Sequence, residues 1–177
     1  MPACRPWIVR RGGCSGRLAR DEQADVQPAY RALDVCRVAN DDADWGLVSA
    51  AYVNADGTPG APSLNVGLLP KFGDHLVPRT GSGMLGLSSG HARSPDQVDS
   101  CNASSCSSNF GGVPPSGFPQ DVPGCSGSSS INDDVALRLT LRAPANATGY
   151  SFDFMFYSFE YPEWICTMWN DQFVALV

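Results

Sequence analysis

Aromatic residues at every second position stand out toward the C-terminal end of the 177-residue chain. From Phe152 to Phe156 the sequence reads FDFMF, so Asp153 and Met155 separate three phenylalanines. Successive side chains of a strand point to opposite faces, and this pattern therefore predicts a strand with one buried aromatic face. We expect its three phenylalanines to belong to the hydrophobic core.

The chain after this strand is expected to bend and then to form another strand. A proline cannot donate to a ladder, which places the bend at Tyr161-Pro162. The next predicted strand covers residues 172–177 and is still running at Val177. This pattern suggests a domain that is truncated at its C-terminal end.

Shorter hydrophobic segments between turn residues predict the other elements. Val135–Arg142 alternates as a half-buried strand does, and Trp45–Val53 predicts a strand that the turn Asn54-Ala55-Asp56-Gly57 follows. We also expect strands at 64–69 and 84–88, a short N-terminal helix at 28–38, and a long Gly/Ser/Pro-rich loop over 91–130. Many short strands separated by turns favour an all-β fold, a jelly-roll-like β-sandwich.

Composition agrees with a loop-rich β protein, because the chain has 18 glycines and 14 prolines and only 17% charged residues. Its length suits one domain. We expect residues 28–177 to form that domain and residues 1–27 to be an unstructured or misassigned leader. A secretory signal needs an apolar core of ~7–15 residues, and here Arg10-Arg11 ends the short apolar run that precedes it.

The net charge of −6 and the isoelectric point near 4.7 argue against a nucleic-acid partner, since phosphates require a basic surface. Residues 1–20 hold five arginines and no acidic residue, which leaves −11 on the remainder. No apolar run approaches the ~20 residues of a membrane span, so none is expected.

Seven cysteines are more than a chain of this length needs for packing. Zinc ligands usually occur at spacings such as C-x2-C, and neither the cysteines nor the two histidines have such a spacing. Disulfides are favoured instead, which implies an oxidising compartment. The disulfide candidates are Cys36, Cys101, Cys106, Cys125 and Cys166. We expect Cys101 or Cys106 to pair with Cys125 and tie the long loop to itself, and Cys36 to lie close to Cys166.

Two motifs raise the question of catalysis. Gly86-Leu87-Ser88-Ser89-Gly90 matches G-x-S-x-G, but no histidine follows His91, and the next segment is not helical in pattern. A structural turn is therefore predicted. Glu160 and Glu163 could form the carboxylate pair of a glycosidase, but residues three apart on a strand face opposite sides. A secreted, glycosidase-like hydrolase that uses carboxylates near Glu160 is kept as the alternative to a non-enzymatic module.

Carboxylates that border strands suggest a calcium site. Calcium takes 6–8 oxygen ligands, and four acidic side chains would supply some of them if their strands were neighbours: Asp133, Asp134, Glu160 and Asp171. The competing interpretation is that these Asx residues only cap turns through nearby backbone amides.

Four aromatic residues fall outside the buried face that the alternation predicts: Tyr157, Tyr161, Trp164 and Trp169. Exposed aromatic rings can stack on sugar rings or on a protein partner. We therefore predict that they bind a cell-surface polysaccharide or a protein ligand, with core packing as the alternative.

Several motifs together resemble the bacterial choice-of-anchor L domain over about residues 30–177. These motifs are Met84-Leu85-Gly86-Leu87-Ser88-Ser89-Gly90, Asn132-Asp133-Asp134, Ser151-Phe152-Asp153-Phe154-Met155-Phe156, Glu160-Tyr161-Pro162-Glu163-Trp164 and Asn170-Asp171-Gln172-Phe173. The Trp45-Gly46 strand and the Gly117-Phe118-Pro119 loop are similar to versions from myxobacteria-like organisms. The resemblance implies a secreted or cell-surface β domain used in adhesion or ligand binding, without an established biochemical activity.

Overall fold

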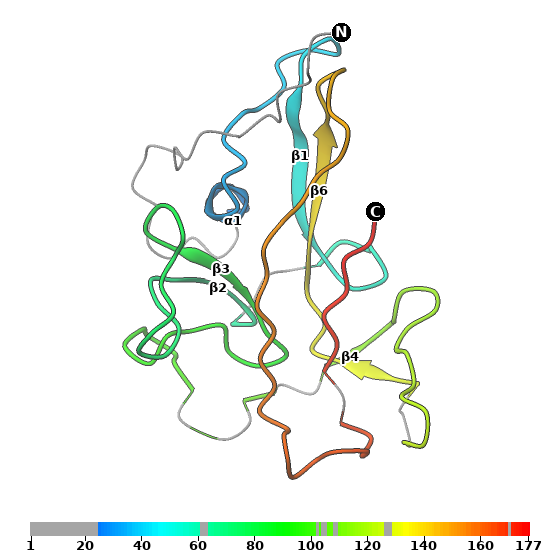
Figure 1. The fold of residues 1–177 in the computed structure, drawn as a ribbon. Coiled ribbons are helices and arrows are strands. Elements are labelled where there is room, and N and C mark those ends of the chain that lie inside the picture. Colours follow the sequence, from blue (N-terminus) through cyan, green and yellow to red (C-terminus); the bar gives the residue numbers. More distant parts are fainter. Residues whose placement is uncertain are drawn as a thin grey trace, which may run out of the picture.

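The longest ladder joins two strands that are far apart in the sequence, β1 (Gly46–Val53) and β6 (Ala136–Arg142) (Figure 1). They are antiparallel, and their register runs from Gly46 opposite Arg142 to Val53 opposite Ala136, with an irregularity between Leu47 and Ser49. The computed structural model describes residues 25–60, 64–101, 103, 106–107, 110–125, 129–169 and 171–177. Both strands confirm the sequence prediction to within one residue.

Two smaller antiparallel sheets contain the remaining strands of the described residues. One pairs β2 (Val66–Leu69) with β3 (Met84–Leu87), and the other pairs β4 (Gly111–Gly112) with β5 (Ile131–Asn132). The described part of the chain is therefore all-β in class, made of small antiparallel sheets with very little helix. The predicted leader falls almost entirely outside the described residues, which begin at residue 25.

The one helix of the described residues, α1 (Gln27–Ala32), is shorter than predicted and packs against β2 and β3. Pro28 suits the first turn, where the missing N–H has no helical partner. The helix ends early because Asp34 has a left-handed φ of 58° and the amide of Val35 donates to the Tyr30 carbonyl. Ala29 and Tyr30 are its buried residues.

The aromatic strand predicted near the C-terminus is wrong. The chain after β6 runs back along the molecule, turns, and returns to the C-terminus without a strand among the described residues (Figure 1). Phe152, Phe154 and Phe156 are 52%, 58% and 50% exposed. Alternation produces a buried face only where a neighbouring sheet covers it, and no described strand pairs with this segment.

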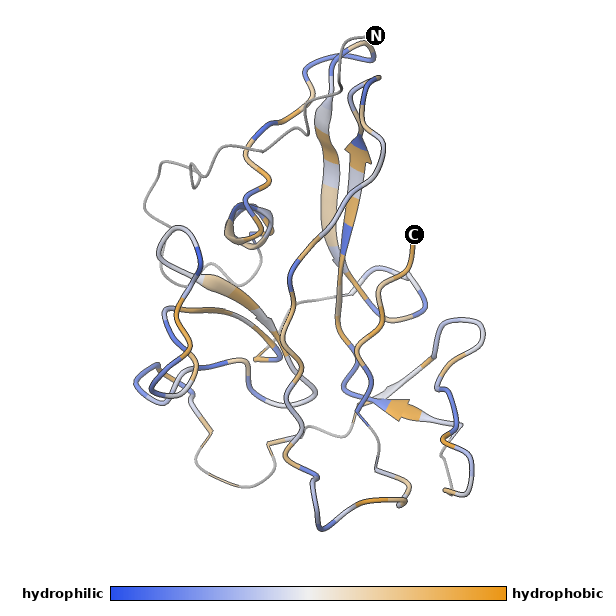
Figure 2. Cartoon of the chain, in the orientation of Figure 1, coloured by the Kyte–Doolittle hydropathy of each residue, from blue (hydrophilic) through white to orange (hydrophobic). Residues whose placement is uncertain are grey.

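The phenylalanines of this segment contact each other instead of a core. The ring centroid of Phe173 lies 4.5 Å from that of Phe154 and 6.5 Å from that of Phe152. The segments predicted as the two C-terminal strands therefore meet through these rings, and residues 172–177, like residues 152–156, form no strand. Figure 2 shows hydrophobic residues continuing along the segment that leads to the C-terminus, outside any strand.

The buried hydrophobic residues of the described chain are few and surround the two larger sheets: Ala29, Tyr30, Leu47, Val53, Val66, Leu69 and Ala92. The start of β1 also depends on a close approach of two backbone segments. Gly46 has a φ of 136°, and a β-carbon there would lie 2.6 Å from the Arg37 carbonyl oxygen, so the position requires glycine.

Arg37 organises the loop before β1 through three contacts. Its guanidinium lies over the Trp45 ring at 4.4 Å, its Nε donates to the Trp45 carbonyl at 2.9 Å, and an Nη pairs with Asp44. The hydrogen bond from Arg37, followed by that from the Asn40 amide, lowers the pKa of Asp44 from 3.8 to about 2. From the other strand of the ladder, Arg142 donates to the Asp44 carbonyl at 2.9 Å.

Removing this arginine gives a direct test of the loop. Asp44 should titrate at about 2 in the native protein, and Arg37→Gln should return its pKa toward 3.8. A carboxyl pKa that is lower in the folded state stabilises the fold at pH values above the unfolded-state pKa. This stabilisation is lost as the pH falls through about 2. NMR titration of the Asp44 carboxyl carbon measures the shift.

The matched control is Arg138→Gln, because Arg138 donates to the Gly57 carbonyl at the far end of the same ladder. This control should leave the Asp44 pKa unchanged. A native Asp44 that titrates near 3.8 would contradict the assigned contacts.

Candidate functional site

Three of the four predicted binding aromatics line one hollow. We call it the aromatic hollow, with a volume of about 170 Å³. Trp164 and Trp169 are 51% and 49% exposed, so their rings are available to a ligand. The lining residues are Val122, Cys125, Ser158, Glu160, Tyr161, Trp164, Ile165, Cys166, Thr167 and Trp169.

Local hydrogen bonds, without any helix or strand, build the side of the hollow that carries the aromatic residues. The amide of Trp164 donates to the Glu160 carbonyl at 2.8 Å, and the Thr167 hydroxyl donates to the Trp164 carbonyl at 2.8 Å. The amide of Trp169 then donates to the Thr167 hydroxyl at 3.3 Å. These contacts fold the chain into a series of turns that bring both indoles to the same hollow.

The opposite wall comes from the long Gly/Ser/Pro-rich loop, which is joined to the turns at two points. The disulfide Cys125–Cys166 links them covalently, with 4.5 Å between the Cα atoms. A few residues away, the Gln120 amide donates to Gln172 Oε1 at 3.1 Å, and Gln172 Nε2 donates to the Gln120 carbonyl at 2.8 Å. We call this disulfide and reciprocal amide pair the clasp.

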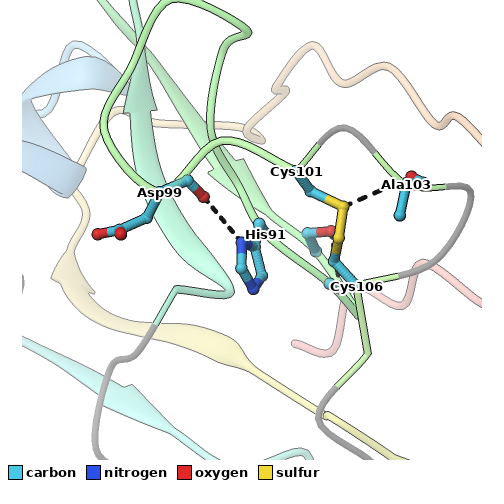
Figure 3. Close-up of a disulfide and its surroundings, with 7 residues drawn as sticks. His91, Asp99, Cys101, Ala103 and Cys106 are labelled. Atoms are coloured by element: carbon cyan, nitrogen blue, oxygen red, sulfur yellow. Dashed lines mark hydrogen bonds between the residues drawn. A yellow bond between two sulfur atoms is a disulfide. The ribbon is translucent and has the colours of Figure 1, made fainter.

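The disulfide pairing differs from the sequence prediction. Cys101 pairs with Cys106, five residues away, with 6.2 Å between the Cα atoms (Figure 3). Cys125 pairs with Cys166 instead of either. Cys36 is disulfide-bonded as well, but Cys166 is not its partner. The long loop closes on itself only locally, because its later part turns at Val122–Cys125 to face the aromatic turns.

Tyr157 is the predicted binding aromatic that lies elsewhere. Its ring contacts Phe72, with 4.6 Å between the centroids, and its hydroxyl donates to the Met155 sulfur at 3.4 Å. Sequence analysis also missed Val122 and the two clasp glutamines. Only the presence of Cys125 in the loop hinted that this region takes part in the site.

Glu160 is the acidic residue of the aromatic hollow. Burial first, and the neighbouring Asp171 carboxylate second, raise the pKa of Glu160, while a hydrogen bond from the Asp171 amide opposes both effects. Glu163, the partner that a glycosidase pair would need, is exposed and does not line the hollow. The nearby second carboxylate is therefore Asp171, not Glu163.

Asp133 and Asp134 lie at a different hollow, of about 350 Å³, beside β4 and the turn after β1. Asp133 is only 8% exposed, and its carboxylate accepts hydrogen bonds from the Phe110 amide at 3.0 Å and from the Ser107 hydroxyl. Asp134 accepts from the Ala55 amide at 2.5 Å. Both carboxylates therefore cap amides of loops that are distant in the sequence, whereas the turn-capping interpretation concerns nearby amides.

The four predicted calcium ligands thus fall into two groups: Asp133 and Asp134 line one hollow, and Glu160 lines the other with Asp171 near it. Within the described ranges, no three acidic, histidine or cysteine side chains are grouped so that they could hold a metal ion. Calcium binding stays a prediction.

The G-x-S-x-G segment begins at the end of β3 and bends at Ser89-Gly90, in place of the turn predicted for the whole segment. Ser88 Oγ accepts a hydrogen bond from the Gly90 amide at 3.0 Å directly after β3. His91 follows, and its Nδ1 lies 2.8 Å from the Asp99 carbonyl oxygen, beside the Cys101–Cys106 disulfide (Figure 3). These contacts fix the entry to the long loop.

Comparison with protein-family models, curated proteins and solved structures finds no match. Across the part of the chain that the structure describes, no helix is both long and apolar enough to cross a membrane. Functional inference therefore rests on the site itself.

Substitution of Asp133 distinguishes a cap from a calcium ligand. Asp133→Ala removes the acceptor of the part-buried hydrogen bond from the Phe110 amide and should lower the free energy of unfolding by about 1–3 kcal/mol. Asp133→Asn keeps an acceptor oxygen and tolerates the left-handed φ of 53°, so it should cost much less. Urea denaturation measures both variants.

The same measurements in millimolar calcium and in chelator complete the test. A capping role predicts the same loss in both buffers. An Asp133→Ala loss that grows in calcium, together with a calcium-dependent rise in the native melting temperature, would instead support the predicted calcium site.

Proposed function

We propose that the chain is a secreted or cell-surface β-sandwich module that binds a ligand without catalysing a reaction. The observation that carries this proposal is the convergence of Tyr161, Trp164 and Trp169 on one hollow held by the clasp. The half-exposed indoles of the free protein leave apolar surface in contact with water, which is unfavourable. A ligand that covers these rings removes this unfavourable hydration free energy.

A polysaccharide is the ligand class we favour. A pyranose ring presents C–H groups that stack on an aromatic face, and its hydroxyls need polar partners at the rim. Ser158 lines the hollow, and its hydroxyl, which accepts from the Glu160 amide at 3.2 Å, can donate its O–H to a sugar. The alternative ligand, a protein surface, would use the same rings as hydrophobic anchors.

Disulfides support the extracellular location, because cysteines stay oxidised mainly outside the cytosol. Two disulfides join described residues, and Cys36 forms a further one. The motifs that resemble the choice-of-anchor L domain point to the same location, and we propose membership of that family on their basis.

Removal of either indole should weaken polysaccharide binding. A stacking contact contributes about 0.5–1.5 kcal/mol, so Trp164→Ala and Trp169→Ala should each raise Kd by about two- to tenfold. A polysaccharide array identifies the ligand, and titration calorimetry measures the affinity. Tyr150→Ala is the control, because Tyr150 is an exposed aromatic outside the hollow.

Equal loss of affinity in the Tyr150 control would place binding elsewhere on the aromatic segment. An array without any bound polysaccharide, combined with a protein ligand that Trp164→Ala releases, would favour the protein-ligand alternative.

A further inference from the structure

The charge of the aromatic hollow is one-sided. Among its ten described lining residues, Glu160 is the single formally charged side chain, and no lysine, arginine or histidine is present. The carboxylate of Asp171 lies close enough to Glu160 to act on its ionisation. An anionic ligand group would therefore meet the Glu160 carboxylate and no basic side chain among these lining residues.

Aromatic faces add to this preference. The π-electron face of tryptophan or tyrosine attracts a cation within about 6 Å of the ring centroid, and tryptophan attracts it most strongly. Two indoles and a phenol border the hollow together with Glu160. The rings exclude water from a bound group, and the carboxylate supplies negative charge. Together they are suited to an organic cation.

The size of the hollow and the net charge of the protein also favour a small cationic group. Pockets for drug-sized ligands begin at roughly 300 Å³, so a hollow of about 170 Å³ fits one head group of a larger ligand. The net charge of −6 also attracts cations toward the protein surface.

We propose that the aromatic hollow binds a substituted ammonium group, held between Trp164, Trp169 and the Glu160 carboxylate. This inference rests on the proposed ligand-binding function and specifies the chemical group that enters the hollow. The ammonium group is carried either by a polysaccharide or by a small quaternary amine. The two sources share the chemistry that the hollow recognises.

Two pairs of probes that differ in charge test the inference. Choline is compared with 3,3-dimethyl-1-butanol, which has the same shape without the charge. Trimethylated chitosan oligosaccharide is compared with the neutral chitin oligosaccharide. Tryptophan fluorescence of the full, oxidised chain follows each titration. At least one cation should bind about tenfold or more tightly than its neutral counterpart.

Variants locate the effect in the hollow. Glu160→Gln should remove most of the difference between charged and neutral probes. Glu163→Gln is the matched control, because it makes the same chemical change three residues away at an exposed position outside the lining. It should keep the difference. Circular dichroism spectra that match the native protein show that each variant is folded.

Each outcome separates the inference from the function on which it rests. Binding of choline alone, or of the charged oligosaccharide alone, supports the inference and identifies the source. Neutral chitin that binds as tightly as its charged counterpart overturns the ammonium group but leaves polysaccharide binding in place. No binding of any probe, together with a blank polysaccharide and protein screen, overturns both.

Discussion

The covalent link between Cys125 and Cys166 is the constraint on which the candidate site depends. Neither segment that it joins has regular secondary structure, and the aromatic side chains between them are largely exposed. A disulfide across 41 residues removes much of the conformational freedom of the unfolded loop. The reciprocal bonds of Gln120 and Gln172 then fix the relative orientation of the two segments.

Polar contacts carry an unusual share of the organisation elsewhere, because the described core is small. Arg37 and Arg142 hold the loop that precedes β1, and Asp133 and Asp134 connect β5 and β6 to neighbouring loops. Each of these groups binds backbone amides or carbonyls. Local structure is therefore set by satisfied hydrogen bonds as much as by apolar burial.

Sequence patterns predicted the elements whose neighbours are also regular. The alternation of Val135–Arg142 and the strand at Trp45–Val53 were readable because the two segments pair with each other along the β1–β6 ladder. The same alternation at Phe152–Phe156 misled, because periodicity indicates a face but does not supply the strand that buries it. The helix was predicted too long, since nothing in its pattern revealed the left-handed Asp34.

The site was predicted as a set of residue types but not as an arrangement. Tyr161, Trp164 and Trp169 were identified by their position outside the predicted face, and the structure brings them together, whereas Tyr157 packs on Phe72. Disulfide partners depend on how distant loops meet. Spacing alone therefore could not reveal that Cys125 faces Cys166.

Disulfide mapping of the oxidised protein is the most direct test of this account. Digestion with trypsin and chymotrypsin under non-reducing conditions cleaves after Phe110 and after Arg138. The first cut separates Cys101 and Cys106 from Cys125, and the second separates these three cysteines from Cys166. We expect mass spectrometry to find the Cys125 peptide linked to the Cys166 peptide, and Cys101 linked to Cys106. A Cys125 peptide linked to Cys101 or Cys106, or a Cys36 peptide linked to Cys166, would contradict the arrangement that forms the aromatic hollow.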